Sequence, residues 1–198
     1  MNTVRTVREL PPGYQETCFL RVTDRSKMIW LNILAIVFMM ISASVFYALL
    51  LLYSKAGAPF VIQRLPQSLS LTVGITLVLG MIPVHEWVHG LAMQYYGHPV
   101  RYGIKPLKGV VYATSDGAYF WRRQFIIVAL APLVVISLIG LFLAAIFPVG
   151  AALWILFMAA MNAAGAAGDL WMVWVLRKIP PGALVRDEQD GMRVFSPI

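Results

Sequence analysis

The fold is decided by residues 124–168, QFIIVALAPLVVISLIGLFLAAIFPVGAALWILFMAAMNAAGAAG, a stretch that carries no charged side chain. A helix that crosses a bilayer needs about 20 apolar residues, so this stretch is too long for a single crossing. Its only break is Pro148-Val149-Gly150, which is typical of a tight turn. We therefore expect two membrane spans, at residues 124–147 and 151–176.

Two more apolar blocks precede this stretch, at residues 29–53 and 69–96. Each is long enough to span a bilayer as a helix, and the second ends at Gly97-His98-Pro99, which terminates helices. The first block exceeds the roughly 7–15 apolar residues of a signal peptide, so we expect it to be retained. The sequence thus predicts an all-α integral membrane protein with four transmembrane helices.

The composition agrees with this fold class. The chain is 60% hydrophobic and 13% charged, with a mean hydropathy of +0.75, which lies outside the balance of soluble domains. We expect one membrane domain over residues 1–198, with cytoplasmic tails at residues 1–27 and 178–198. The net charge of +7 is attributed to cytoplasmic loops of a membrane protein, and no nucleic-acid partner is expected.

The distribution of Lys and Arg predicts the orientation in the membrane. Five precede the first span, two lie between the first and second, five follow the second, none separates the third from the fourth, and four follow the fourth. Basic residues collect on the cytoplasmic side, so both termini are expected in the cytoplasm and the protein in the inner (plasma) membrane. The single Cys18 excludes an internal disulfide and fits a reducing compartment.

The loop after the second span has a different character. Apolar residues alternate on both sides of Lys105-Pro106-Leu107-Lys108-Gly109, which predicts a small β-hairpin between the second and third spans. Non-helical backbone at membrane depth must be buried in protein or line a wet cavity, so the hairpin should lie against the helices at the cytoplasmic face. Its exposed edge could bind an extended substrate segment by strand addition.

The chemistry is indicated by His85-Glu86-Trp87-Val88-His89, near the end of the second span. Two histidines four residues apart on a helix project from one face, as two imidazoles that bind one metal ion must. In zinc hydrolases of this pattern the glutamate is the general base that takes a proton from the activated water. Ionisable residues are costly inside a bilayer, which favours a functional zinc site over incidental polar contacts between helices.

A catalytic zinc ion commonly has three protein ligands, so a third must lie elsewhere in the chain. Asp169 is the principal candidate, because it lies eight residues before Arg177, just as His89 lies eight residues before Gly97. The second and fourth spans run in the same direction in the predicted topology, so the two side chains are expected at equal depth. His98 is the alternative third ligand.

Asn162 shares a helical stripe with Gly165, Ala166 and Asp169. Small residues on this stripe would allow close approach to the second span. Asn162 could then donate a hydrogen bond into the site as a substrate-binding residue, or make an ordinary contact between helices.

The chain resembles a small bacterial family of multi-span membrane proteins described as zincin peptidases, which is related in layout to site-2 proteases. The resemblance covers nearly the whole chain, and its most specific part is the segment from His85 to His89. Its other parts are Leu10-Pro11-Pro12-Gly13-Tyr14, the hairpin, residues 124–133 with Ala131-Pro132, Asn162 and Gly168-Asp169. Site-2 proteases carry an Asn and a later zinc-binding Asp-Gly in their last catalytic helix. Here the order is Gly168-Asp169-Leu170 and the intervening prolines are absent. The site-2 protease pattern therefore supports Asp169 as a ligand but does not assign a role to Asn162.

The expected function is that of an integral-membrane zinc metalloprotease. His85, His89 and Asp169 would bind Zn²⁺, and Glu86 would be the catalytic base. The expected partners are a membrane protein or peptide substrate and the lipid bilayer; no oligomeric state is predicted. The alternative is a non-enzymatic adaptor or regulator that zinc stabilises, although a closed structural site prefers four protein ligands and does not need Glu86. A metal transporter is disfavoured by the lack of inverted repeats.

Overall fold

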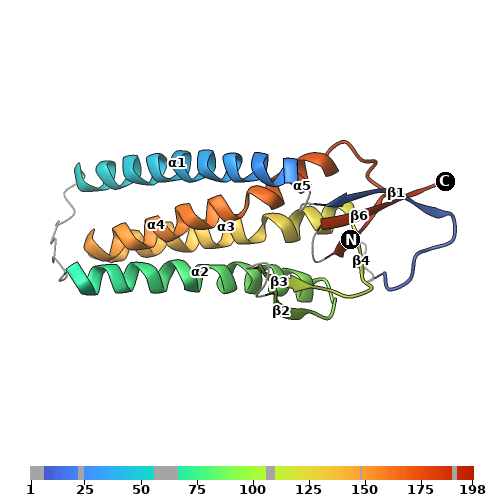
Figure 1. The fold of residues 1–198 in the computed structure, drawn as a ribbon, viewed down its shortest axis with the longest axis horizontal. Helices are drawn as coiled ribbons and strands as arrows, with labels where there is room; N and C mark the ends of the chain where they lie inside the picture. Colours follow the sequence, from blue (N-terminus) through green and yellow to red (C-terminus); the bar gives the residue numbers. More distant parts are fainter. Residues whose placement is uncertain (1–6, 22–24, 56–66, 106–109, 148, 189–190) are drawn as a thin grey trace. The chain divides into compact units, whose positions relative to one another are not determined.

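The computed structural model describes residues 7–21, 25–55, 67–105, 110–147, 149–188 and 191–198. Within these residues the chain forms five helices and six strands (Figure 1). The helices are α1 (Arg25–Lys55), α2 (Gln67–Tyr95), α3 (Arg122–Ile146), α4 (Val149–Gly165) and α5 (Ala167–Leu176). The strands are β1 (Tyr14–Arg21), β2 (Arg101–Lys105), β3 (Val110–Thr114), β4 (Tyr119–Trp121), β5 (Leu184–Glu188) and β6 (Gly191–Pro197).

Three helices in the described part of the chain are long and apolar enough to cross a membrane: Arg25–Leu49 of α1, Gly74–Tyr95 of α2 and Arg122–Ile146, which is α3. The predicted fourth span at residues 151–176 is not one helix. It consists of α4 and α5, which are bent by 44° at a short break. The break follows Gly165, and glycine is the residue at which helices most readily change direction apart from proline.

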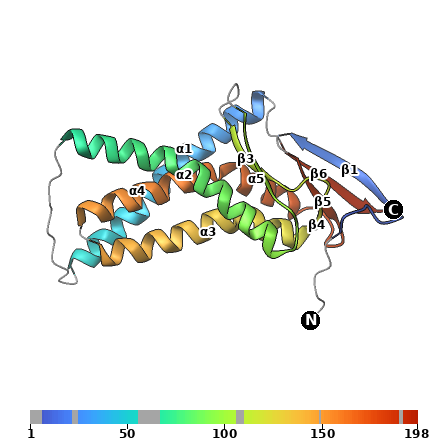
Figure 2. The same ribbon diagram turned by 90° about the horizontal axis from the view of Figure 1, so that it is seen from below.

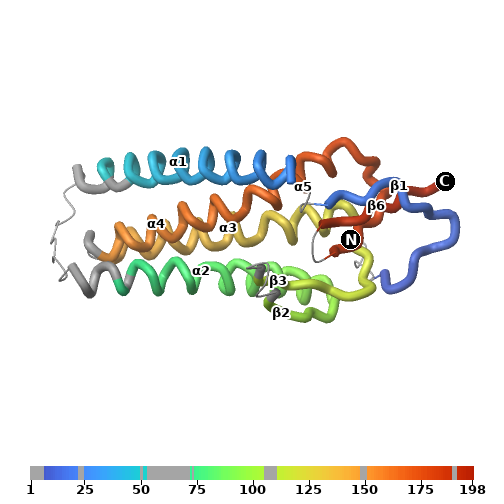
Figure 3. The backbone as a smooth tube through the Cα atoms, in the orientation of Figure 1, coloured from blue at the N-terminus to red at the C-terminus, as the bar shows by residue number. Residues whose placement is uncertain are grey.

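The prediction of an all-α fold is wrong, because the two tails, together with β4 from the segment before α3, form an antiparallel four-stranded sheet of order β1-β6-β5-β4. Figure 3 shows the N-terminal β1 in blue beside the C-terminal β6 in red. Val7 extends the pairing by a bridge to Tyr119 at the edge of β4. The tails bury the apolar pairs Leu184-Val185 and Val194-Phe195. Such short apolar runs are typical of strands, because an amphipathic helix needs a longer run with a repeating apolar face.

The predicted hairpin is present. β2 and β3 pair from Arg101 with Thr114 to Lys105 with Val110. The turn of the hairpin at residues 106–109 lies outside the described residues, as do the linker at 56–66 and Pro148 of the predicted tight turn. Upstream, α2 ends in a Schellman motif: Gly97 has φ 78°, and the N–H of His98 donates to the carbonyl of Met93.

The chain divides into two compact units. The first comprises residues 1–31, 86–131 and 168–198, and its core lies under the four-stranded sheet and includes Phe120, Leu176 and Val194. The second comprises residues 32–85 and 132–167. In this unit α3 and α4 lie side by side, whereas α1 crosses them at an angle in the view of Figure 2. Small side chains such as Ala144 of α3 and Ala152 and Ala159 of α4 allow close packing. A single domain over the whole chain stays a prediction.

Candidate metal centre

The first pair of candidate ligands lies within the unit that holds the sheet. His89 projects from α2, and Asp169 lies in the first turn of α5. His89 Nε2 is 3.5 Å from Asp169 Oδ2, and both residues are buried. His89 Nδ1 lies 2.9 Å from the carbonyl oxygen of Val128 in α3. Because a carbonyl can only accept, Nδ1 carries a proton, and Nε2 is the ring nitrogen that faces Asp169.

His85 is oriented in the same way within the other unit. Its Nδ1 is 2.9 Å from Asn162 Oδ1, and Asn162 Nδ2 donates to the carbonyl of Pro132 at 3.1 Å. The carbonyl of Pro132 fixes which end of the Asn162 amide faces it, so Oδ1 must face His85. The proton of His85 therefore lies on Nδ1, and Nε2 is the nitrogen left for a metal ion.

α2 runs without a break from His85 to His89, so the two imidazoles lie one helical turn apart on one face. One ligand atom from each of His85, His89 and Asp169 lies within 4.8 Å of the other two. Two imidazole nitrogens and one carboxylate oxygen are a donor set that suits zinc and leaves a coordination position open. The three residues that the sequence predicts as ligands are thus brought together and could hold a metal ion.

Glu86 is half-buried beside the ligands, and the hairpin contacts it directly. Its Oε2 accepts a hydrogen bond of 2.8 Å from the backbone N–H of Ala113 in β3. Gly90 on α2 lies against the side chain of Tyr102 in β2, whose hydroxyl oxygen a Cβ atom at position 90 would meet. The sequence predicted a hairpin against the helices, and the contact between Ala113 and Glu86 is a detail that it did not reveal.

Asn162 is 1% exposed, and both ends of its amide are engaged by His85 and Pro132. A substrate-binding role for Asn162 stays a prediction, whereas its contacts are those of a residue that orients a ligand. Neighbouring Gly165 has His85 Nδ1 within 3.9 Å of the position of a Cβ atom. A Cβ atom at this position would thus make an ordinary contact with the imidazole, and the close approach of this stripe to the second span stays a prediction.

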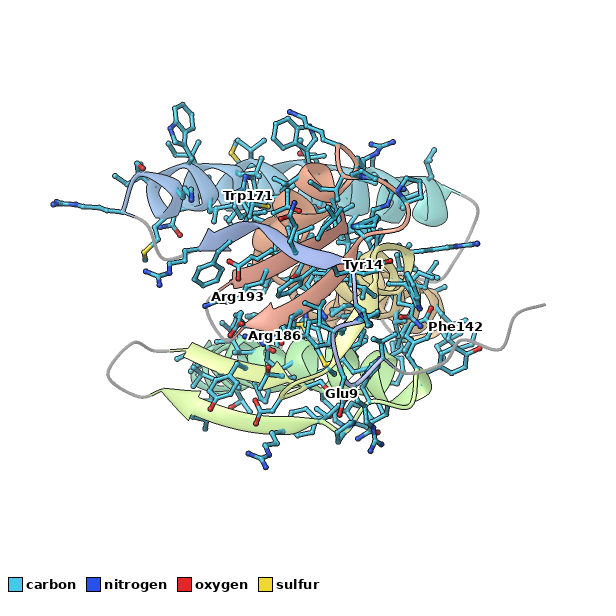
Figure 4. The ribbon with its side chains drawn as sticks, turned by 90° about the vertical axis from the view of Figure 1, so that its right-hand side faces the viewer. Glu9, Tyr14, Phe142, Trp171, Arg186 and Arg193 are labelled. Carbon is cyan, nitrogen blue, oxygen red and sulfur yellow. The ribbon has the colours of Figure 1, made fainter. Side chains whose placement is uncertain are left out.

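Asp187 in β5 is an acid near the site that sequence reasoning missed. Its neighbours Arg186 and Glu188 pair with each other at 2.7 Å, and Arg186 lies opposite Arg193 of β6 (Figure 4). Strand alternation places Asp187 on the other face of the sheet, together with buried Val185. The pKa of Asp187 is raised to about 7, chiefly because burial disfavours the carboxylate, while the Thr114 hydroxyl and His89 act in the opposite direction. The sequence could have indicated Asp187, because it is a charged residue on the same face of the strand as the buried, apolar Val185.

His98, the alternative third ligand, lies apart from this group. It is 2% exposed, its ring lies 4.1 Å from that of Phe120, and neither ring nitrogen has a hydrogen-bond partner among the described residues. Its pKa is lowered to about 4, first by burial and then by the charge of Arg8. His98 therefore packs as a neutral aromatic residue behind the end of α2.

Because His98 is buried as a neutral ring, we expect the stability of the folded protein to fall in acid. An unfolded histidine titrates near 6.5, so between about pH 6.5 and 4 the unfolded chain binds a proton that folded His98 does not. Stability should fall as the pH falls through this window, by up to about 3 kcal/mol from His98 alone, and this loss should level off below pH 4. Thermal unfolding of detergent-purified wild type and His98→Phe at pH 7.5, 6, 5 and 4 measures the difference. Equal pH dependence of the two proteins would contradict a buried neutral His98.

A buried pair of oriented histidines, an acidic third ligand and an adjacent glutamate are the parts of a zincin-like metal site. A family model described as "Putative zincin peptidase" matches residues 78–184, more than half of the chain, and the chain belongs to this family. Neither a search of curated proteins nor a search of solved structures found a match. Family and site together support a metallopeptidase, and Asp187 lies beyond the matched segment.

Proposed function

We propose that this protein is an integral-membrane zinc metalloprotease, similar to site-2 proteases, that hydrolyses peptide bonds within or next to the bilayer. The observation that carries the proposal is that His85, His89 and Asp169 come together, and that the two histidines and Glu86 lie on α2, a helix apolar enough to cross a membrane. Ionisable side chains inside a membrane cost free energy, so they are usually found there only where they serve a function. A purely structural zinc site would need a fourth protein ligand and would have no use for Glu86.

The residues divide the chemistry among them. His85, His89 and Asp169 would hold the ion, and zinc in such a site lowers the pKa of a bound water towards 7. Glu86 accepts the proton of the attacking water and then delivers it to the nitrogen of the departing amine, so that the C–N bond breaks to release a neutral amine and a carboxylic acid instead of an amide anion. The N–H of Ala113 fixes the orientation of the Glu86 carboxylate during this transfer.

The hairpin is suited to present the substrate. Ala113 directs its N–H to Glu86 and not to β2, so this edge of β3 faces the catalytic base. Val111, two residues earlier, directs its backbone groups to the same edge. An extended peptide that pairs with this edge would lie next to the metal ligands. A helical substrate would first have to unwind, because its backbone groups are otherwise already paired.

The proposed location is the inner (plasma) membrane, with several spans and both termini in the cytoplasm. This orientation rests on the five Lys and Arg before residue 29 and on those of the hairpin segment and the C-terminal tail. The site would then open near the cytoplasmic face. Its substrates would be membrane proteins or peptides, and the basic residues would contact lipid headgroups and not nucleic acid.

Metal removal tests the proposal. The detergent-purified protein is expected to contain one zinc ion per chain and to cleave a randomised decapeptide library or a synthetic single-span peptide, with products identified by mass spectrometry. Treatment with 1,10-phenanthroline should reduce cleavage to background, and added Zn²⁺ should restore it, because the activated water depends on the ion. Cleavage that persists in metal-free protein would refute the proposal. One bound zinc ion without any cleavage would favour the adaptor instead.

A further inference from the structure

Pro132 lies inside α3, where proline is unusual because it has no N–H to donate. In a regular helix the carbonyl of residue 128 accepts the N–H of residue 132. The proline deprives the carbonyl of Val128 of this donor, and that carbonyl is the one that His89 Nδ1 contacts at 2.9 Å. The missing helical hydrogen bond is thus replaced by a bond that orients a candidate metal ligand.

The same proline also orients the second histidine. Its own carbonyl accepts a hydrogen bond from Asn162 Nδ2 at 3.1 Å, and Asn162 Oδ1 in turn faces His85 Nδ1 at 2.9 Å. Pro132 and Asn162 are both almost fully buried, so water does not compete for these groups. One residue therefore influences the orientation of both imidazoles, through the carbonyl of Val128 that it leaves without a helical donor and through its own carbonyl.

We infer that Pro132 is a positioning residue of the metal centre, which sets the Nδ1–H tautomer of His89 by freeing the carbonyl of Val128 and that of His85 through Asn162. This inference rests on the proposed function for its importance in catalysis, but not for its test. Partners that orient ligating histidines typically contribute 10–100-fold to metal affinity. Pro132 would thus raise the affinity for the metal ion, whereas α3 loses one helical hydrogen bond.

The test is the variant Pro132→Ala, measured without any substrate. Alanine restores an N–H that competes with His89 for the Val128 carbonyl and straightens α3. We expect the Kd for Zn²⁺, measured against a competing chelator, to rise 10–100-fold. Because alanine is the best helix former and proline the worst, the metal-free variant should unfold at the same or a higher temperature than wild type. A merely structural role for Pro132 predicts instead that stability and zinc affinity fall together.

The tautomer can be observed directly. The chain has only three histidines, and His98→Phe in the background removes the third, so ¹⁵N spectra of the metal-free protein report on His85 and His89 alone. The spectra are recorded at alkaline pH, so that both rings are neutral although the Asp169 carboxylate lies 3.5 Å from His89 Nε2. Both should carry the proton on Nδ1 in the parent, and His89 should shift towards a tautomer mixture in Pro132→Ala. An unchanged tautomer together with wild-type zinc affinity would overturn the inference.

Pro83 provides the matched control, because it is the proline inside α2. The carbonyl that it leaves without a helical donor belongs to Leu79, a residue whose side chain is 64% exposed. Pro83→Ala should therefore keep the zinc affinity and both tautomers. An equal loss of affinity in Pro83→Ala and Pro132→Ala would overturn the specific role of Pro132. The proposed protease function fails on a different result, namely cleavage that survives metal removal.

Discussion

Glu86→Gln is expected to lower kcat for peptide-bond cleavage by about 10²–10⁴-fold, the usual contribution of a general acid–base residue. Glutamine has the shape of glutamate but cannot accept the proton of the attacking water. Its amide oxygen can still accept the N–H of Ala113, so the contact between α2 and β3 should persist. Because Glu86 does not belong to the group of ligands, the zinc content should stay at one ion per chain.

The measurement pairs zinc stoichiometry with initial rates on the single-span peptide. Asp116→Asn is the control, since Asp116 is an exposed acid that pairs with Arg101 at 2.9 Å outside the site. An exposed ion pair contributes little, so this variant should cleave at the wild-type rate. Full cleavage by Glu86→Gln with zinc retained would exclude Glu86 as the base and would leave the metal centre to be explained in another way.

The three candidate ligands could be predicted because the spacing of the histidines is a local pattern and Asp169 was chosen only by its expected depth in the membrane. The spacing of His85 and His89 follows from helical periodicity, and Asp169 was placed by counting residues to the ends of two apolar helices. The structure brings these three residues together. What the sequence did not reveal is the set of backbone partners. The carbonyl of Val128 is available only because residue 132 is a proline, and this consequence requires knowing that α2 lies beside that turn of α3.

The four-stranded sheet was not predicted, because its evidence in the sequence is spread over both ends of the chain. β1 pairs with β6 between residues that lie at least 170 positions apart in the chain, and no local pattern specifies such a pairing. No strand of the sheet buries more than three apolar side chains: β6 buries Met192, Val194 and Phe195, whereas β1 has no buried residue. These short apolar runs are weak signals compared with the long apolar helices, so the two ends of the chain were interpreted as tails. The break between α4 and α5 was missed for a related reason, since Gly165 lies in a stretch that is apolar throughout.

Asp169→Ala is expected to weaken zinc binding by more than about 100-fold, which exceeds the loss that follows removal of an outer hydrogen-bond partner. The variant keeps both histidines but loses the oxygen that lies 3.5 Å from His89 Nε2. Two imidazoles on one helical turn bind zinc more weakly than three ligands, and cleavage should fall in proportion to the bound metal. Asp169→Asn, which retains a neutral oxygen at the same place, should give an intermediate affinity.

His98→Phe completes this experiment, because His98 was the other candidate for the third ligand. Its ring packs on Phe120 away from the ligand group, and phenylalanine can keep that contact. The variant should therefore bind zinc as tightly as wild type. If Asp169→Ala instead bound zinc normally and His98→Phe lost it, the third ligand would be His98, and the end of α2 would have to rearrange to bring the imidazole to the metal. A loss in Asp169→Ala alone would place the third ligand on α5, so that the centre depends on α5 as well as on α2.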